Sequence, residues 1–286
     1  MLLREGLPDR SDYDRWAVEV KFDGMRGQFR LDEGGWSLRS RPGRDCTDEF
    51  PEISALADHL DGRPVILDGE LVCLDEQGAP DFHRVRNRLQ SRGDRSGRAP
   101  ATLIVFDVLY LDGQPLLGQP YEERRRILHD LLGDGSVWRT PRHWVATIDE
   151  VCEITRAHQL EGVVCKRLDS IYRPGKRSGG WLKHKHRRRE LLAVTGWAQR
   201  DDEPDVLYLG RVVGGRRTFA GTAQFGLDEQ RRRKLRAALR THAAPSRQRR
   251  PIRDVRPGVW VEVDCHGAAH RPIRDAVIRD VIVNPH

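Results

Sequence analysis

Alternation of apolar and charged residues near the start of the chain places the strongest constraint on its fold. In the stretch "WAVEVKF", every second residue is apolar: Trp16, Val18, Val20 and Phe22. Successive side chains of a β-strand point to opposite faces, so this period of two predicts a strand with one apolar and one charged face. Glu19, Lys21 and Asp23 are expected to share the charged face. A solvated face is the ordinary interpretation, so a chemical role for Lys21 needs support from elsewhere in the chain.

Patterns further along the chain mix strands with helices. Strands are predicted over residues 36–41, 63–75 and 99–113, and two more within 160–190 on either side of a glycine-rich loop. Helical spacing of apolar residues predicts helices over residues 48–60, 120–132 and 148–159. This mixture of strands and helices favours an α+β fold.

The sequence changes character after about residue 190. Short strands with turns between them predict a small β-barrel, and one basic helix near 228–241 is expected to bury Leu235 and Leu239. A polar loop is predicted over 242–254. A chain of 286 residues suits two domains better than one.

The charge balance and the cysteines exclude some classes of protein. A net charge of +7 and a pI near 9.4 favour a polyanionic partner, nucleic acid first and an anionic membrane second. No apolar run reaches about 18 residues, and the first residues do not resemble a signal peptide, so we expect a cytoplasmic protein without a membrane span. The five cysteines show no C-x-x-C spacing and are expected to be reduced rather than zinc-bound: Cys46, Cys73, Cys152, Cys165 and Cys265.

Lysine is scarce in this chain. Only six of the 50 basic residues are lysine: Lys21, Lys166, Lys176, Lys183, Lys185 and Lys234. High genomic GC content is one explanation for the arginine bias. A need for a compact amine or a nucleophile at the remaining positions is another.

Short polar segments follow one another in a specific order. They are K-x-D-G-x-R at 21–26, S-R-x-G at 40–43, D-G-E at 68–70, F-D at 106–107, E-G-V-V-x-K at 161–166 and W-L-K-x-K at 181–185. Each segment is a weak signal alone, but the ordered set is specific. Over about residues 12–265 the chain resembles the ATP-dependent DNA ligases among the covalent nucleotidyltransferases. It looks most similar to small bacterial ligases and to the ligase module of bacterial end-joining enzymes.

This resemblance implies a fold and an activity. It implies a nucleotidyltransferase, or adenylation, domain over residues 1–188, with antiparallel sheets and flanking helices. An OB-fold β-barrel is implied over residues 189–286. The implied enzyme uses ATP and Mg²⁺ or Mn²⁺ to seal nicks in double-stranded DNA during repair, through lysyl-AMP and 5′-adenylated DNA. A monomer in the bacterial cytoplasm is expected, with a repair polymerase or an end-binding protein as a candidate partner.

The resemblance also implies catalytic roles. Lys21 would attack the α-phosphate of ATP, while Lys183 and Lys185 would grip that phosphate and stabilise the transition state. A free lysine has a pKa near ~10.4, so nearby cations would have to lower the pKa of Lys21 before it attacks. Glu161 would contribute to a metal site, and Glu70 would bind the ribose or assist the metal.

Further residues would bind the nucleotide. The resemblance implies that Glu19 reads the adenine edge and that Phe106 stacks on the base. Arg26 and Arg41 would hold the ribose and the phosphate of the nick, because guanidinium groups suit phosphate oxygens. Lys166 is expected to join this nucleotide-binding set.

Simpler interpretations stay open for several residues. Asp68 or Glu70 fits a surface hairpin, Asp107 fits a structural role, and Phe106 fits an apolar core. Lys183 and Lys185 also fit a plain nucleic-acid-binding run. For the whole chain, the alternatives are an RNA ligase or capping-type nucleotidyltransferase, and a non-catalytic nucleic-acid-binding relative.

The end of the chain departs from the ligase pattern. Ligases of this kind carry an R-x-D-K-like motif that orients pyrophosphate, whereas this chain has only Arg274-Asp275 and Arg279-Asp280. We therefore expect self-adenylation to be weaker than sealing of pre-adenylated nicks. The basic stretches "RRRK" and "RQRRPIR" are expected to follow a DNA backbone without reading its sequence.

Overall fold

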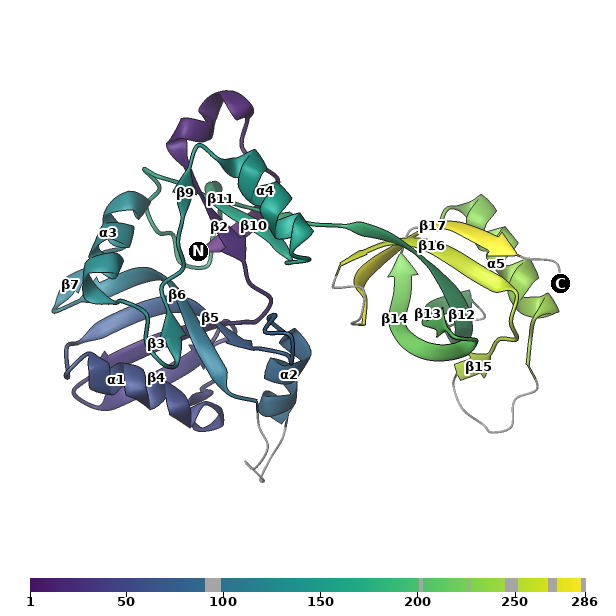
Figure 1. Cartoon of the computed structure of the whole chain (residues 1–286), viewed down its shortest axis with the longest axis horizontal. Coiled ribbons are helices and arrows are strands. Elements are labelled where there is room, and N and C mark those ends of the chain that lie inside the picture. The colour runs from purple at the N-terminus through teal and green to yellow at the C-terminus, as the bar shows by residue number, and fades with distance from the viewer. Residues whose placement is uncertain (91–98, 201–202, 226, 245–251, 267–271, 284–286) are drawn as a thin grey trace. The chain divides into compact units, whose positions relative to one another are not determined.

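The computed structural model describes the chain apart from residues 91–98, 201–202, 226, 245–251, 267–271 and 284–286. The described residues form two compact units, Met1–Lys185 and His186–His286 (Figure 1). Each unit has its own hydrophobic core. No helix in the described ranges is long and apolar enough to cross a membrane.

The first unit contains two sheets. The sheet with strand order β1-β11-β10-β2-β9 comprises Leu2–Glu5 (β1), Trp16–Lys21 (β2), Trp144–Val145 (β9), Gly162–Arg167 (β10) and Arg177–Lys185 (β11). The sheet with order β4-β3-β5-β6-β7 comprises Met25–Asp32 (β3), Gly35–Ser40 (β4), Val65–Cys73 (β5), Ala101–Leu111 (β6) and Gln114–Pro115 (β7), with Trp138–Arg139 (β8) beside β6. The pairings are antiparallel except β1–β11 and β6–β8.

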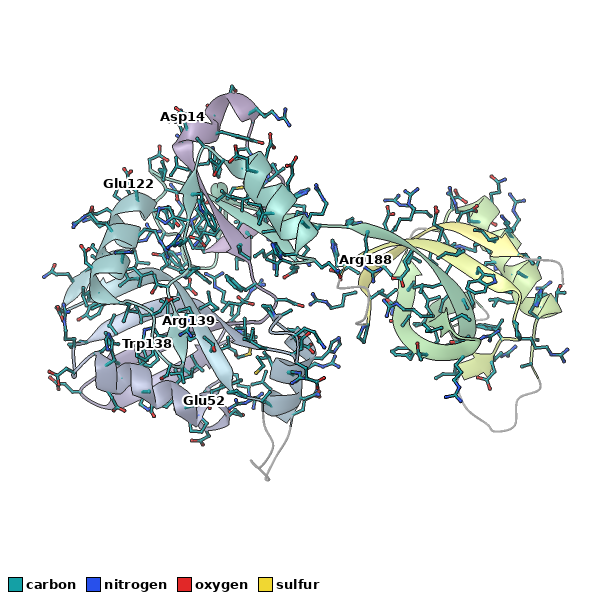
Figure 2. The ribbon with its side chains drawn as sticks, in the orientation of Figure 1. Asp14, Glu52, Glu122, Trp138, Arg139 and Arg188 are labelled. Carbon is teal, nitrogen blue, oxygen red and sulfur yellow. The ribbon has the colours of Figure 1, made fainter. Side chains whose placement is uncertain are left out.

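Short helices flank these sheets. They are the 3₁₀ helices Arg10–Arg15 (η1), Thr47–Glu49 (η2) and Pro51–Ile53 (η3), and the α-helices Ser54–His59 (α1), Phe82–Gln90 (α2), Tyr121–Leu131 (α3) and Ile148–Ala157 (α4). The predicted helix over 48–60 is split into η2, η3 and α1, because Pro51 lacks an N–H and fits only at the start of a turn. Arg88 of α2 donates to the carboxylate of Glu52 at 2.5 and 2.9 Å, which ties α2 to η3. Figure 2 labels Glu52 of η3.

The strand predicted near the amino terminus is β2, but two of its expected features differ. Trp16 packs into an apolar core beneath α4, as predicted. Glu19 is 3% exposed rather than solvated, because its carboxylate is turned into the unit. Asp23 lies beyond the end of the strand, where the chain passes close to β5. A Cβ atom at Gly24 would lie 2.1 Å from the backbone oxygen of Leu71, so this passage requires glycine.

The five cysteines are free, as expected from their spacing, and the structure buries all of them. Burial raises the pKa of the Cys73 thiol to about 11 and that of the Cys165 thiol to about 12. Buried thiols of this kind stay protonated at neutral pH and are inert.

The second unit is a barrel. Its strands are Arg188–Arg200 (β12), Glu203–Val213 (β13), Arg216–Phe225 (β14), Ile252–Asp254 (β15), Val259–His266 (β16) and Arg274–Val283 (β17). They pair in the order β13-β14-β17-β16-β12-β15, and an additional β13–β12 pairing closes the ring. This closed ring is consistent with the predicted OB-fold barrel.

The helix Glu229–Thr241 (α5) accompanies the barrel. The side chain of Asp228 accepts a hydrogen bond from the backbone N–H of Arg231 at 2.8 Å and caps the helix. Leu235 and Leu239 are buried, as predicted. Most of the predicted polar loop over 242–254 falls in 245–251, outside the described residues.

A buried ion pair fixes α3 against the sheet of β6. Arg124 of α3 donates from Nε to Asp107 Oδ1 at 2.8 Å and from Nη2 to Asp107 Oδ2 at 2.9 Å. Both side chains are 0% exposed. Arg124 also donates to the backbone oxygens of Gln119 and Ser170. Asp107 therefore has a structural role, which the sequence had left open.

Replacing Asp107 with Asn should destabilise the first unit strongly. The change leaves the Arg124 guanidinium buried without a counter-charge, and breaking such a pair costs about 3–5 kcal/mol. Asp112→Asn is the matched control, since Asp112 pairs with Arg63 and their side chains are 46% and 48% exposed. An exposed pair is worth about 0–1 kcal/mol. Urea unfolding followed by tryptophan fluorescence measures both, and equal losses would contradict the prediction.

Candidate active site

A pocket in the first unit brings together six of the residues predicted for the site. They are Glu19, Lys21, Arg26, Glu70, Phe106 and Lys166. Strands β2 and β10 of one sheet and strands β3, β5 and β6 of the other supply these residues (Figure 1). The pocket therefore lies between the two sheets, and Trp181 of β11 completes its apolar wall.

Lys21 is the last residue of β2 and lies opposite Gly162 of β10. Its Nζ donates to Glu161 Oε2 at 2.6 Å, and Lys185 Nζ lies 3.3 Å from Glu161 Oε1. Gly162 has a φ of +150°, and a Cβ atom there would lie 2.0 Å from the backbone oxygen of His184. Glycine is therefore required where β10 approaches β11, next to the carboxylate that contacts Lys21.

A buried ion pair forms part of the pocket wall. Lys166 Nζ donates to Glu19 Oε1 at 2.9 Å and lies 2.8 Å from Oε2. The ammonium lies 4.4 Å from the ring centre of Phe106 and 4.5 Å from that of Trp181, which is within cation–π range. The hydroxyl of Tyr121, the first residue of α3, also donates to Glu19 Oε1.

The charges around Glu19 keep its carboxylate ionised. Burial alone would raise the pKa of Glu19, but the positive charges of Lys166 and Arg125 and hydrogen bonds from Lys166 and Tyr121 together lower it. Burial lowers the pKa of Lys166, and the negative charge of Glu19 opposes that effect. The pair is therefore an ammonium facing a carboxylate.

Arg26 of β3 is anchored firmly within the protein. Its Nε and Nη2 donate to the two oxygens of Asp68 at 3.0 and 2.5 Å. Nη2 also donates to the hydroxyl of Tyr172 at 3.0 Å, and that hydroxyl donates to Asp68 Oδ2 at 2.7 Å. Asp68 is 2% exposed, so it is an internal partner of Arg26 rather than a surface acid.

Glu70 of β5 lines the same pocket and has an unusual protonation state. Burial is the main cause that raises its pKa, to about 8, and the negative charges of Glu161 and Asp68 add to it. The positive charges of Lys21 and Arg26 offset these effects only in part. The carboxyl is therefore mostly protonated at neutral pH, unlike a solvated acid in a hairpin.

Four predicted residues do not line this pocket: Arg41, Glu161, Lys183 and Lys185. Glu161 and Lys185 still join it through the contacts of Glu161 with Lys21 and Lys185. Lys183 Nζ lies 3.3 Å from Glu5 Oε2 of β1, so it has a different partner from Lys185. Arg41 is exposed just after β4 and lines a neighbouring groove together with Arg39. Arg26 lines both this groove and the pocket, and so connects the two cavities.

The basic residues near the end of the chain belong to the second unit. Arg274 is the first residue of β17. Arg279 Nε donates to Asp264 Oδ2 at 2.6 Å. The expectation that self-adenylation is weaker than sealing of pre-adenylated nicks stays a prediction.

Besides Glu5, several residues that contact the predicted site residues were missed by the sequence analysis. They are Tyr121, Arg125 and Tyr172. Tyr121 occupies the start of a predicted helix, and nothing in its spacing indicates a contact with Glu19, which lies 102 residues earlier. These contacts arise from tertiary packing and carry no local signal.

The residues predicted to bind a metal ion are two carboxylates, Glu70 and Glu161. Among the described residues, no group of three or more His, Cys, Asp or Glu could hold a metal ion. Glu161 is close enough to Glu70 for its charge to raise the pKa of Glu70.

Replacing Glu70 with Gln should change how stability depends on pH. The Glu70 carboxyl loses its proton near pH 4.5 in the unfolded chain and near pH 8 in the folded one. Unfolding between these values releases a proton, so the stability that Glu70 contributes is full below pH 4.5 and is lost as the pH rises through 8. From about pH 5 to about pH 8, the free energy of unfolding should fall in the wild type relative to Glu70→Gln. Urea titrations across this range measure the difference, and a constant difference would refute the prediction.

Comparisons with known proteins agree on one family. The family model described as "ATP dependent DNA ligase domain" matches residues 8–185. The chain is 36% identical over 269 residues to the multifunctional non-homologous end joining DNA repair protein LigD of Mycobacterium tuberculosis, covering 92% of this chain and 34% of that protein. It is 29% identical over 298 residues to the LigD protein of Pseudomonas aeruginosa, covering 96% and 34%. The chain thus spans about a third of the length of these curated relatives.

Solved structures share the fold. The ligase domain of Mycobacterium tuberculosis LigD matches with a TM-score of 0.56 at 33% identity, covering 93% of this chain and 88% of that one. A mycobacterial DNA ligase D complexed with ATP and MES matches with a TM-score of 0.57 at 33% identity, covering 94% and 90%. These matches confirm the predicted α+β nucleotidyltransferase fold and do not favour the RNA ligase or capping alternatives. The chain belongs to the ATP-dependent DNA ligase domain family.

Proposed function

We propose that this chain seals nicks in double-stranded DNA through an adenylate carried on Lys21. The observation that carries the proposal is the contact of 2.6 Å between Lys21 Nζ and Glu161 Oε2, beside a pocket lined by aromatic and charged residues. Membership of the ligase family supports the choice of ATP and DNA as substrates.

The proposed reaction has three steps. The Lys21 amine loses a proton and bonds to the α-phosphorus of ATP, while the bond to pyrophosphate breaks. A 5′-phosphate oxygen of the nick then displaces the lysine and takes the AMP. The 3′-hydroxyl finally attacks the 5′-phosphate and AMP leaves. Glu161 Oε2 already accepts a hydrogen bond from Nζ, so it is within reach of the proton that Lys21 must lose.

The other walls of the pocket suit an adenine nucleotide. Phe106 provides an aromatic ring for stacking on the base, and Glu19 presents an ionised acceptor to its amino edge. Lys185 shares Glu161 with Lys21 and is therefore positioned to place positive charge near the α-phosphate. We propose the same role for Lys183 once a nucleotide competes with Glu5 for it.

Glu70 and Glu161 fit a divalent cation. Burial and the negative charge of Glu161 raise the pKa of Glu70, and a cation beside the two carboxylates would favour its ionised form. Mg²⁺ prefers carboxylate oxygens and completes its coordination with water and substrate phosphates, so two protein ligands are enough. Such an ion, or Mn²⁺ in its place, would neutralise charge on the phosphates of ATP.

DNA contacts are proposed for each unit separately. In the first unit, the groove of Arg39 and Arg41 shares Arg26 with the nucleotide pocket, which suits a nick phosphate close to the adenylate. In the second unit, α5 carries the basic run 231–234. The other basic stretch, 247–253, falls largely outside the described residues.

The relatives suggest a biological setting. The LigD proteins of Mycobacterium tuberculosis and Pseudomonas aeruginosa are named for non-homologous end joining. We therefore propose that this chain acts in DNA end joining in a bacterial cytoplasm. It would act as a monomer that receives its substrate from a repair polymerase or an end-binding protein.

Replacing Lys21 with Arg should abolish covalent labelling by α-labelled ATP. Arginine keeps the positive charge but stays protonated, so it cannot act as a nucleophile. Intact mass should show one added adenylate on the wild type and none on Lys21→Arg. Lys176→Ala is the control, since this lysine lies outside the pocket, and it should label normally. Labelling that survives in Lys21→Arg would eliminate Lys21 as the carrier.

Binding of nicked duplex DNA should weaken steeply with salt. Each phosphate contact contributes about 0.9 to the slope of log affinity against log salt concentration. Replacing both Arg232 and Arg233 with Gln should reduce that slope by about 1–2 and weaken binding equally for all sequences. Fluorescence anisotropy at several salt concentrations measures the slope. An unchanged slope would show that α5 does not contact the backbone.

A further inference from the structure

The hydroxyl of Tyr121 occupies an acceptor position on the Glu19 carboxylate. Tyr121 is 0% exposed, and its hydroxyl donates to Glu19 Oε1. Lys166 Nζ donates to the same oxygen at 2.9 Å. A carboxylate offers about four lone-pair positions on its two oxygens. Both positions on Oε1 are therefore filled. Lys166 Nζ also lies 2.8 Å from Oε2, so one acceptor position, on Oε2, remains for a ligand.

This limit matters because purine bases differ in their donors. Adenine presents one amino group at C6, and a single acceptor oxygen satisfies one of its N–H groups. Guanine presents N1–H and the 2-amino group side by side, and two parallel carboxylate oxygens match them. A carboxylate with one oxygen already filled can accept from adenine but cannot accept both donors of guanine.

We propose that Tyr121 determines base specificity by restricting Glu19 to recognition through one oxygen, which favours 6-aminopurine over guanine nucleotides. The proposal rests on the proposed function, because it takes the pocket to hold the base of a purine nucleotide against Glu19. Tyr121 is then a positioning residue that acts through Glu19.

The surroundings of Tyr121 hold its hydroxyl in place. The ring of Tyr121 packs edge-on against His143 with ring centres 6.3 Å apart, and the Lys166 ammonium lies 5.0 Å from the ring centre of Tyr121. Arg124, three residues later in α3, is locked to Asp107 by two hydrogen bonds. The hydroxyl also stays a donor at neutral pH, because burial and the negative charge of Glu19 raise the pKa of Tyr121 well above its ordinary value.

Equilibrium binding of ATP, GTP and ITP without divalent metal tests the proposal, with calorimetry as the readout. The wild type should prefer ATP and should bind GTP and ITP alike, because the extra 2-amino group of guanine finds no acceptor. Tyr121→Phe removes only the hydroxyl. It should reduce the preference for ATP over GTP by about tenfold and make GTP bind more tightly than ITP.

Tyr13→Phe is the matched control. The Tyr13 hydroxyl donates to Asp149 Oδ1 at 2.9 Å, and neither residue lines the pocket. The same chemical change at this distant tyrosine–carboxylate pair should leave all three affinities unchanged.

The comparison of GTP with ITP uses the wild-type protein alone, so its result does not depend on whether a variant folds. Tighter binding of GTP than of ITP there would overturn the proposal, and so would a uniform loss of affinity in Tyr121→Phe.

Intact mass after incubation with ATP and Mg²⁺ separates this proposal from the ligase function. If calorimetry shows the expected base preferences but intact mass shows no lysyl-AMP, the ligase function alone is rejected. If lysyl-AMP forms but the ratio of ATP affinity to GTP affinity is unchanged in Tyr121→Phe, the role of Tyr121 alone is rejected. Failure to bind any of the three nucleotides would reject both.

Discussion

The antiparallel pairing of β2 with β10 is the constraint on which the site depends. Its register sets Lys21 opposite Gly162 and Glu19 opposite Val164, so that Lys21 meets Glu161 and Glu19 meets Lys166. A slip of one residue would turn the side chains of β2 to the opposite face and separate both pairs. The backbone ladder therefore positions the nucleophile before any side chain does.

Buried ion pairs specify this geometry more than they stabilise the fold. Lys166 with Glu19, Arg26 with Asp68, and Arg124 with Asp107 each carry charges out of water, which costs nearly as much as their attraction returns. Removing one partner lowers the free energy of unfolding by far more than the intact pair adds to it. Each pair therefore excludes alternative packings of the strands and of α3, and fixes the direction in which its side chains point.

Sequence reasoning succeeded where the signal was local or came from ordered segments. The period of two identified β2. The order of the polar segments pointed to Lys21 and Glu161, and in the structure Lys21 Nζ lies 2.6 Å from Glu161 Oε2. Sequence reasoning failed where long-range packing determines the position of a residue or its contacts. Asp23 leaves the strand because Gly24 presses against β5, and the contact of Tyr121 with Glu19 depends on how α3 docks. No spacing within one segment carries that information.

The burial of every cysteine has a practical consequence. Native thiols that are shielded and protonated react slowly with maleimides, so a single cysteine introduced at an exposed position would be modified selectively. One such position in each unit would accept a donor and an acceptor fluorophore without prior removal of the natural thiols. Energy transfer between the dyes would then measure the distance between the two labelled positions in solution.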